Sequence, residues 1–173
     1  MIFHRLGLIN KNQKGFTLIE ILIAMAITGL IAGGITGAIS HVIIGSARST
    51  NHMTAVRQVQ DAGYWVSRDA QMAQDITLTE PTGFPLTLDI SVDMDPANDY
   101  TISYSLDGDK LKRQENGSPE TLIAEYIDTD QTTCEFIDTN EDNIDDTLIL
   151  TITATVGTES ETRIYEVIPR PGL

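Results

Sequence analysis

The fold of this 173-residue chain is decided by FTLIEILIAMAITGLIAGGITGAISHVII, the stretch from Phe16 to Ile44. Its 29 residues hold one carboxylate, Glu20, one imidazole, His41, and no Lys or Arg. A helix of about 20 apolar residues crosses the hydrocarbon core of a bilayer. The sequence therefore predicts a transmembrane helix over residues 16–44.

The residues before this stretch are basic. Arg5, Lys11 and Lys14 precede Gly15, and no acidic residue does. The positive-inside rule then predicts a single-pass protein of the cytoplasmic (inner) membrane, with its N-terminus inside and its remaining domain outside the cytoplasm. A secretory signal peptide fits poorly, because its apolar region is about 7–15 residues long and ends at the cleavage site. A plain uncleaved anchor stays open.

Glu20 is the unusual residue of the apolar stretch. A charged carboxylate within a membrane costs several kcal/mol unless it is paired or lies near an interface. In the first turn of the helix the dipole favours an anion, so Glu20 can be a tolerated interfacial acid. The functional alternative needs a cation, and cleavage after Gly15 would create one at the α-amino group of Phe16. Two offset helices could then neutralise one another.

The segment KGFTLIEILIAMAITGLIAG resembles the signature of type IV prepilins and type II secretion pseudopilins. The resemblance implies cleavage between Gly15 and Phe16 by a prepilin peptidase, N-methylation of Phe16, and filament assembly that depends on Glu20. It also implies that the partners are other pilin or pseudopilin subunits, membrane lipid and an inner-membrane assembly platform. The final location of the mature chain would be a filament or the cell surface. One departure is Gly37, which stands where many major pilins have a helix-kinking proline.

After Ile44 the helical spacing continues with a more polar composition, which predicts an amphipathic helix over residues 45–76. Arg68 and Asp69 are among the residues expected on its polar face, whereas Tyr64 and Trp65 are expected to extend its buried side. The stripe expected to be buried consists of Met53, Val56, Val59, Ala62, Val66, Ala70 and Ala73.

A β-rich region is predicted over residues 84–168, because short alternating segments are separated by turn signals. Asp107-Gly108 predicts a tight hairpin, and Asn116-Gly117 marks a second turn. The predicted fold class is thus α+β, with a long N-terminal helix packed on an antiparallel β-sheet head. The predicted organisation is a cleaved leader (1–15), an assembly helix (16–44) and a soluble head (45–173).

The segment YTISYSLDGDKLKRQENGSPETLIAEYID more loosely resembles J-type pseudopilins and W-type minor pilins, through Leu111 and Arg113 in a Leu-x-Arg strand. This second resemblance favours a minor subunit.

The charge of the chain is strongly acidic, with 11 Lys and Arg against 25 Asp and Glu and a net charge of −14. Such a surface repels phosphate backbones, so no direct contact with nucleic acid is expected. Cys134 is the only cysteine, which excludes an internal disulfide. All three histidines precede the β-rich region, and no phosphate-binding loop or zinc-ligand pair occurs, so we do not expect an enzyme.

One segment, FIDTNEDNIDDTL, has oxygen ligands at the spacing with which calcium loops begin. The candidate ligands are Asp138, Asn140, Asp142, the carbonyl of Ile144, and Asp146. Because the glutamate that closes such loops is missing, an acidic solvated turn is the alternative. The candidate cofactor is therefore calcium. The sequence thus favours a structural filament subunit, and the alternative function is a membrane-tethered binding module or calcium-dependent adhesin.

Overall fold

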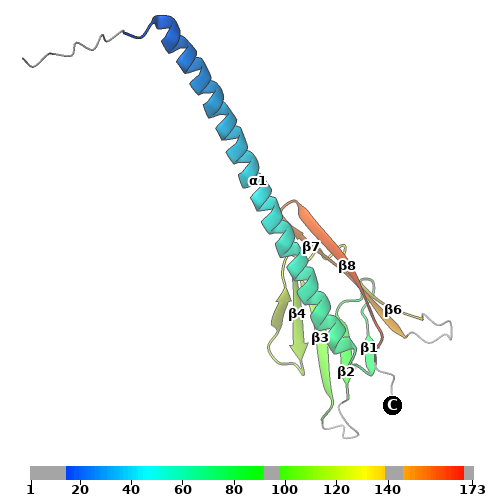
Figure 1. The fold of residues 1–173 in the computed structure, drawn as a ribbon. Coiled ribbons are helices and arrows are strands. Elements are labelled where there is room, and N and C mark those ends of the chain that lie inside the picture. The colour runs from blue at the N-terminus through cyan, green and yellow to red at the C-terminus, as the bar shows by residue number, and fades with distance from the viewer. Residues whose placement is uncertain (1–14, 92–97, 139–145, 170–173) are drawn as a thin grey trace, which may run out of the picture. The chain divides into compact units, whose positions relative to one another are not determined.

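The computed structural model describes residues 15–91, 98–138 and 146–169. Within these ranges one long helix is followed by antiparallel strands, which is the predicted α+β, pilin-like architecture (Figure 1). The chain divides into two compact units, Met1–Gly45 and Ser46–Leu173. The elements are α1 (Leu18–Ala70), β1 (Asp75–Thr77), β2 (Leu86–Ile90), β3 (Tyr100–Asp107), β4 (Lys110–Glu115), β5 (Thr121–Ala124), β6 (Thr133–Ile137), β7 (Thr147–Val156) and β8 (Glu159–Val167).

Helix α1 ends at Ala70, six residues before the predicted end at residue 76. The residues beyond it join a sheet. The backbone N–H of Gln74 donates to the carbonyl of Asp89 at 2.9 Å, and β1 pairs with β2. Ile76 and Thr77 are β-branched and favour strands over helices. The segment that periodicity alone assigns to the helix therefore pairs with β2 at the edge of the sheet.

The buried side of α1 differs from the predicted one. Ala55 is fully buried, whereas its neighbour Val56, which was predicted in the stripe, is half-buried. Met53 and Tyr64 are exposed by 67% and 61%, whereas Asp69 is only 1% exposed. The observed stripe passes through Ala55, Val59, Ala62, Val66 and Ala70. Tyr64 lies two residues, or about 200°, from Ala62, which points it away from the core, while Asp69 follows Val66 by three residues and shares its face.

The β-rich region forms the predicted antiparallel strands, which are divided between two sheets. The first has the order β1-β2-β3-β4-β5 and the second β6-β7-β8, with every pairing antiparallel. The predicted turn at Asp107-Gly108 joins β3 to β4, and Asn116 and Gly117 both have positive φ, at 47° and 71°. Alternation identifies strands but does not say which strands pair, so the division into two sheets had no sequence signal.

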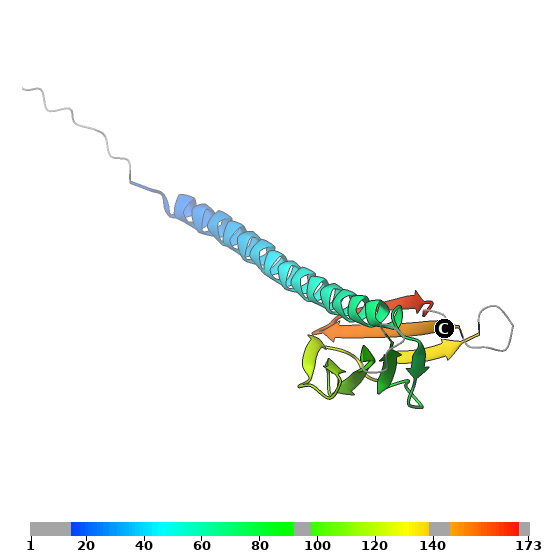
Figure 2. The ribbon, with the colours of Figure 1, turned by 90° about the horizontal axis from the view of Figure 1, so that it is seen from below.

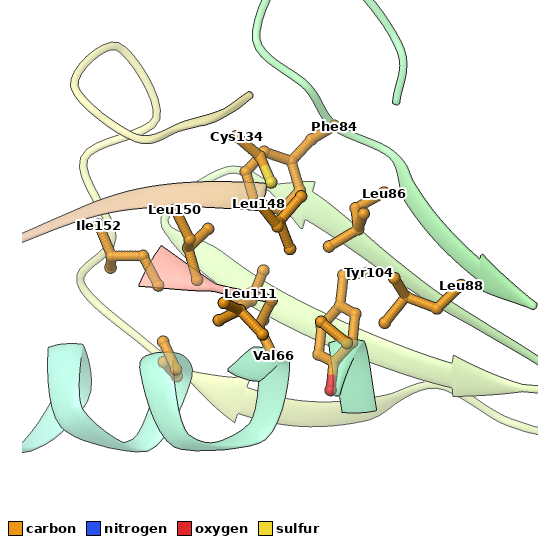
Figure 3. Packing of buried hydrophobic residues seen from close by; sticks show 14 of the residues in the cluster. Val66, Phe84, Leu86, Leu88, Tyr104, Leu111, Cys134, Leu148, Leu150 and Ile152 are labelled. Atoms are coloured by element: carbon orange, nitrogen blue, oxygen red, sulfur yellow. The ribbon is translucent and has the colours of Figure 1, made fainter. Parts of the chain in front are cut away.

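One hydrophobic core lies between the second part of α1 and both sheets (Figure 2). Side chains from the three layers converge in Figure 3, where Val66 of α1 faces Leu111 of the first sheet and Leu150 of the second. The core draws all its buried residues from the range Ala55–Val167, so the Ser46–Leu173 unit has a complete core of its own. From here on we call this unit the head.

Candidate processing and assembly site

The apolar stretch forms the first part of α1, and its side chains are exposed throughout. Among the described residues α1 is the one helix long and apolar enough to cross a membrane, judged by length and composition. Its hydroxyl groups have internal partners, since Thr28, Thr36 and Ser40 each donate to the carbonyl four residues earlier, at 2.8–3.0 Å. A helix with satisfied hydroxyls and an apolar surface is suited to lipid or to other helices.

The first turn of α1 is capped by Thr17. The backbone N–H of Glu20 donates to Oγ1 of Thr17 at 3.3 Å, and that hydroxyl donates to Oε2 of Glu20 at 3.5 Å. Thr-x-x-Glu is the capping-box sequence, in which the side chains at the two ends of the first turn satisfy helix-end donors. Glu20 therefore has a local structural role, and Thr17 is a site residue that the sequence reading missed although its motif was present.

Gly15 and Phe16, the predicted processing junction, lie just before α1, which begins at Leu18. The Phe16 side chain is 80% exposed. Phe16 and Glu20 border the same open apolar groove, together with Ile21 and Ala24. A new amino group at Phe16 would therefore begin one helical turn from an exposed carboxylate.

A buried ion pair in the head was also missed by the sequence reading. Asp69 Oδ2 accepts hydrogen bonds from the Tyr104 hydroxyl at 2.5 Å and from Arg113 Nε at 2.7 Å. The Arg113 guanidinium also lies over the ring of Trp65, 5.6 Å from its centroid. The burial of Asp69 could have been predicted from its position, because it follows Val66 by three residues and so lies on the buried stripe of α1.

Burial and Asp69 set the acid–base behaviour of this cluster. Burial, followed by the hydrogen bond to Asp69, raises the pKa of Tyr104 well above its usual value. Burial opposes the charge of Arg113, but its hydrogen bond to Asp69 and the charge of Asp69 together prevail, so the pKa of Arg113 is raised. Tyr104 is thus a neutral donor and Arg113 a permanent cation, and both donate to Oδ2 of Asp69.

The predicted calcium ligands lie largely outside the described residues, which include Asp138 and Asp146 but not Asn140, Asp142 or Ile144. Asp146 acts locally, since its Oδ1 accepts a 2.8 Å hydrogen bond from the Thr147 hydroxyl. In the described ranges no group of three or more His, Cys, Asp or Glu side chains is placed to hold a metal ion. The calcium site stays a prediction.

Cys134 is buried in β6, an edge strand of the three-stranded sheet. Burial, with a smaller effect from the charge of Glu135, raises the pKa of its thiol to about 12. Since the thiolate is the reactive form, this cysteine is not a nucleophile at neutral pH.

Comparison with known proteins assigns the N-terminal segment. The prokaryotic N-terminal methylation motif matches residues 10–36, which include Gly15, Phe16 and Glu20. No curated protein and no solved structure matches the chain. The chain therefore carries a type IV prepilin-like leader. Together with the long apolar helix, this leader supports a membrane-anchored, type IV pilin-like or pseudopilin subunit.

Proposed function

We propose that this chain is a minor pilin or pseudopilin, a structural subunit of a type IV pilus-like or type II secretion filament. The observation that carries the proposal is the methylation motif, because it falls in register with a helix that exposes its apolar side chains from Leu18 to Ile44. A plain anchor could use Glu20 as a capping residue, but it would not need the Gly-Phe junction in register with that glutamate.

Maturation begins with cleavage between Gly15 and Phe16 by prepilin peptidase, followed by N-methylation of Phe16. The mature helix then has a cationic amine at its first residue and Glu20 one turn later. In a low-dielectric surrounding an unpaired carboxylate is costly, and a neighbouring amine relieves that cost. Glu20 of one subunit pairs with the Phe16 amine of the next, while apolar faces pack between them.

Before assembly the helix spans the inner membrane, with the leader in the cytoplasm and the head outside. The basic residues of the leader favour this orientation. The partners are prepilin peptidase, membrane lipid, the inner-membrane assembly platform and neighbouring pilin or pseudopilin subunits. No catalytic residue is assigned to the chain.

The test is mass spectrometry of the chain in sheared filaments and in membranes from the producing cells. We expect an N-terminus at methylated Phe16 and a small share of the filament protein. A dominant share would make it the major subunit. An intact leader found only in membranes would contradict the proposal and favour the membrane-tethered binding module.

A further inference from the structure

The part of α1 that follows the apolar stretch carries no acidic residue at its start. Of the 25 Asp and Glu of the chain, all except Glu20 lie at or beyond Asp61. The Lys and Arg side chains between these two acids are Arg48 and Arg57, and both are exposed. A chain with a net charge of −14 thus begins its head with a cationic segment.

Arg48 has no carboxylate within reach on its own helix. Side chains three and four positions apart are neighbours on a helix surface. At Arg48 these neighbours are Ile44, Gly45, Asn51 and His52. The guanidinium group is therefore not neutralised by α1.

The turn between β7 and β8 does not supply a carboxylate to Arg48 either. This turn approaches α1 at Asn51, since a Cβ on Gly157 would lie 2.8 Å from the side-chain nitrogen of Asn51. The acidic residue beside the turn is Glu159, whose Oε1 accepts a hydrogen bond from the Thr158 hydroxyl at 3.2 Å. Among the described residues, Arg48 takes part in no ion pair.

The position of Arg48 along the sequence of α1 indicates its acceptor. Arg48 is four residues past Ile44, the last residue of the apolar stretch, which is about 6 Å along a helix. The polar head-group layer on each side of a bilayer is about 5–7 Å thick. A helix that crosses the membrane with residues 16–44 therefore brings Arg48 to the lipid phosphates, whichever way the chain is oriented. Arg57 is about 20 Å past Ile44 and lies beyond them.

The apolar stretch alone does not fix the depth of the helix in the membrane. Its 29 residues exceed the about 20 that cross the hydrocarbon core, so the helix could occupy several depths at similar cost. A guanidinium group binds phosphate through two parallel hydrogen bonds, which gives the contact a defined geometry. Such a contact at one end of the stretch would select one of these depths.

We propose that Arg48 binds the phosphate of an anionic phospholipid and thereby holds α1 at one depth in the membrane. An anionic phospholipid is the favoured partner because no cationic group on its own head balances the phosphate. The inference rests on the membrane span of the proposed function, and it is independent of cleavage, methylation and filament assembly. Attraction to an anionic bilayer strengthens binding about fivefold for each arginine at its surface.

The experiment uses the full-length chain, reconstituted into vesicles of phosphatidylcholine and phosphatidylglycerol in equal parts. In one sample a trace of the phosphatidylglycerol carries a photoreactive diazirine on its head group, and in the other the diazirine is in the acyl chain. After irradiation, peptide mass spectrometry maps the labelled residues. We expect the head-group probe to label residues 45–52, and Arg48→Gln should lower this labelling about fivefold.

Two further variants separate charge at this position from charge elsewhere on the helix. Arg48→Lys keeps the positive charge and should keep most of the labelling. Arg57→Gln is the matched control, since Arg57 is also exposed on α1 but lies beyond the head groups, and it should leave the labelling unchanged. Unchanged labelling in Arg48→Gln, or equal losses in Arg48→Gln and Arg57→Gln, would overturn the inference.

The acyl-chain probe reports the membrane span separately, through labelling of residues 21–44. Labelling there without head-group labelling at residues 45–52 would remove the lipid contact alone. The absence of acyl-chain labelling would remove the membrane span, and with it both the proposed function and this inference.

Discussion

Asp69 on α1 accepts a 2.7 Å hydrogen bond from Nε of Arg113 on β4, 44 residues further along the chain. The same carboxylate oxygen accepts the hydroxyl proton of Tyr104 on β3. The Asp69 side chain is 1% exposed and that of Arg113 is 16% exposed, so the pair is shielded from water. It ties the last turn of the helix to two neighbouring strands of the five-stranded sheet, and it gives the Arg113 of the Leu-x-Arg strand a structural role.

Removal of the Asp69 carboxylate should therefore destabilise the head severely. Asp69→Ala leaves the Arg113 charge and the Tyr104 hydroxyl without their partner, and such a loss costs about 3–5 kcal/mol. Urea denaturation of the head, Ser46–Leu173, measures it. Asp61→Ala, at an exposed position on the same helix, should change the free energy of unfolding by less than about 0.5 kcal/mol. Similar effects of the two substitutions would contradict the role of the buried pair.

Tyr104 should make the head sensitive to alkaline pH. Its folded-state pKa is raised above the ordinary value of 10.0, so its contribution to stability is complete below pH 10 and declines as the pH rises further. Phenolate absorbance should show this phenol titrating only when the head unfolds. In Tyr104→Phe the rise in phenolate absorbance that accompanies unfolding should be smaller by one tyrosine. The free energy of unfolding of this variant should also fall less steeply above pH 10. Phenolate signal from Tyr104 in the folded head would argue against this.

Gly63→Ala should destabilise the contact between α1 and β8. The added methyl group would meet the Tyr165 ring, which could move away only by giving up its hydrogen bond to the Val59 carbonyl. Overpacking of this kind costs about 1–3 kcal/mol. The thermal midpoint of the head should fall accordingly. In a Tyr165→Ala background, Gly63→Ala should lower the thermal midpoint much less. Equal decreases in the parent chain and in the Tyr165→Ala background would show that the Tyr165 ring is not the obstacle.

Glu20 combines a helix-capping contact with a charge, and substitutions can separate the two. Glu20→Gln retains a residue suited to the capping box but loses the charge. Thr17→Ala loses the cap, at about 0.5–2 kcal/mol of helix stability, and keeps the charge. Glu20→Gln and Glu20→Ala should both insert in the membrane yet fail to enter filaments, whereas Thr17→Ala should assemble. Filament incorporation is measured by immunoblot of sheared fractions. Normal assembly of Glu20→Gln would contradict the charge-pairing mechanism.

Calcium binding at residues 138–146 is open to a direct test by calorimetric titration of the chain. If these residues form a calcium site, calcium addition should release or absorb heat and raise the thermal midpoint. Asp142→Asn, which removes a charged ligand from the candidate set, should weaken both effects. The absence of heat and of stabilisation in the parent chain would assign the segment to an acidic surface turn.

The sequence predicts the parts of this fold that depend on local pattern. The uncharged run after Glu20 predicts the apolar helix, alternation from Leu86 to Ile90 predicts β2, and the positive φ that Asn116-Gly117 readily adopts predicts a turn. For the candidate site, the spacing of the Gly-Phe junction and the following glutamate predicts Gly15, Phe16 and Glu20. The capping role of Thr17 could have been predicted from the Thr-x-x-Glu motif in the same segment.

The remaining features depend on partners distant in the chain. Asp69 can be buried only because Arg113 and Tyr104 meet it, and no local pattern reports that meeting. The strand Asp75–Thr77 exists because β2 offers it an edge to pair with. Side-chain periodicity does not report contacts between residues that are far apart in the chain.

The single, deeply buried thiol of Cys134 has a practical consequence. With its pKa near 12 and its side chain 3% exposed, it should stay silent toward maleimide dyes at neutral pH. A cysteine introduced on the outer surface of the head would then be the one reactive thiol of the subunit. The parent chain should therefore give little background in fluorescent labelling, so that subunits with an introduced cysteine could be followed individually by microscopy.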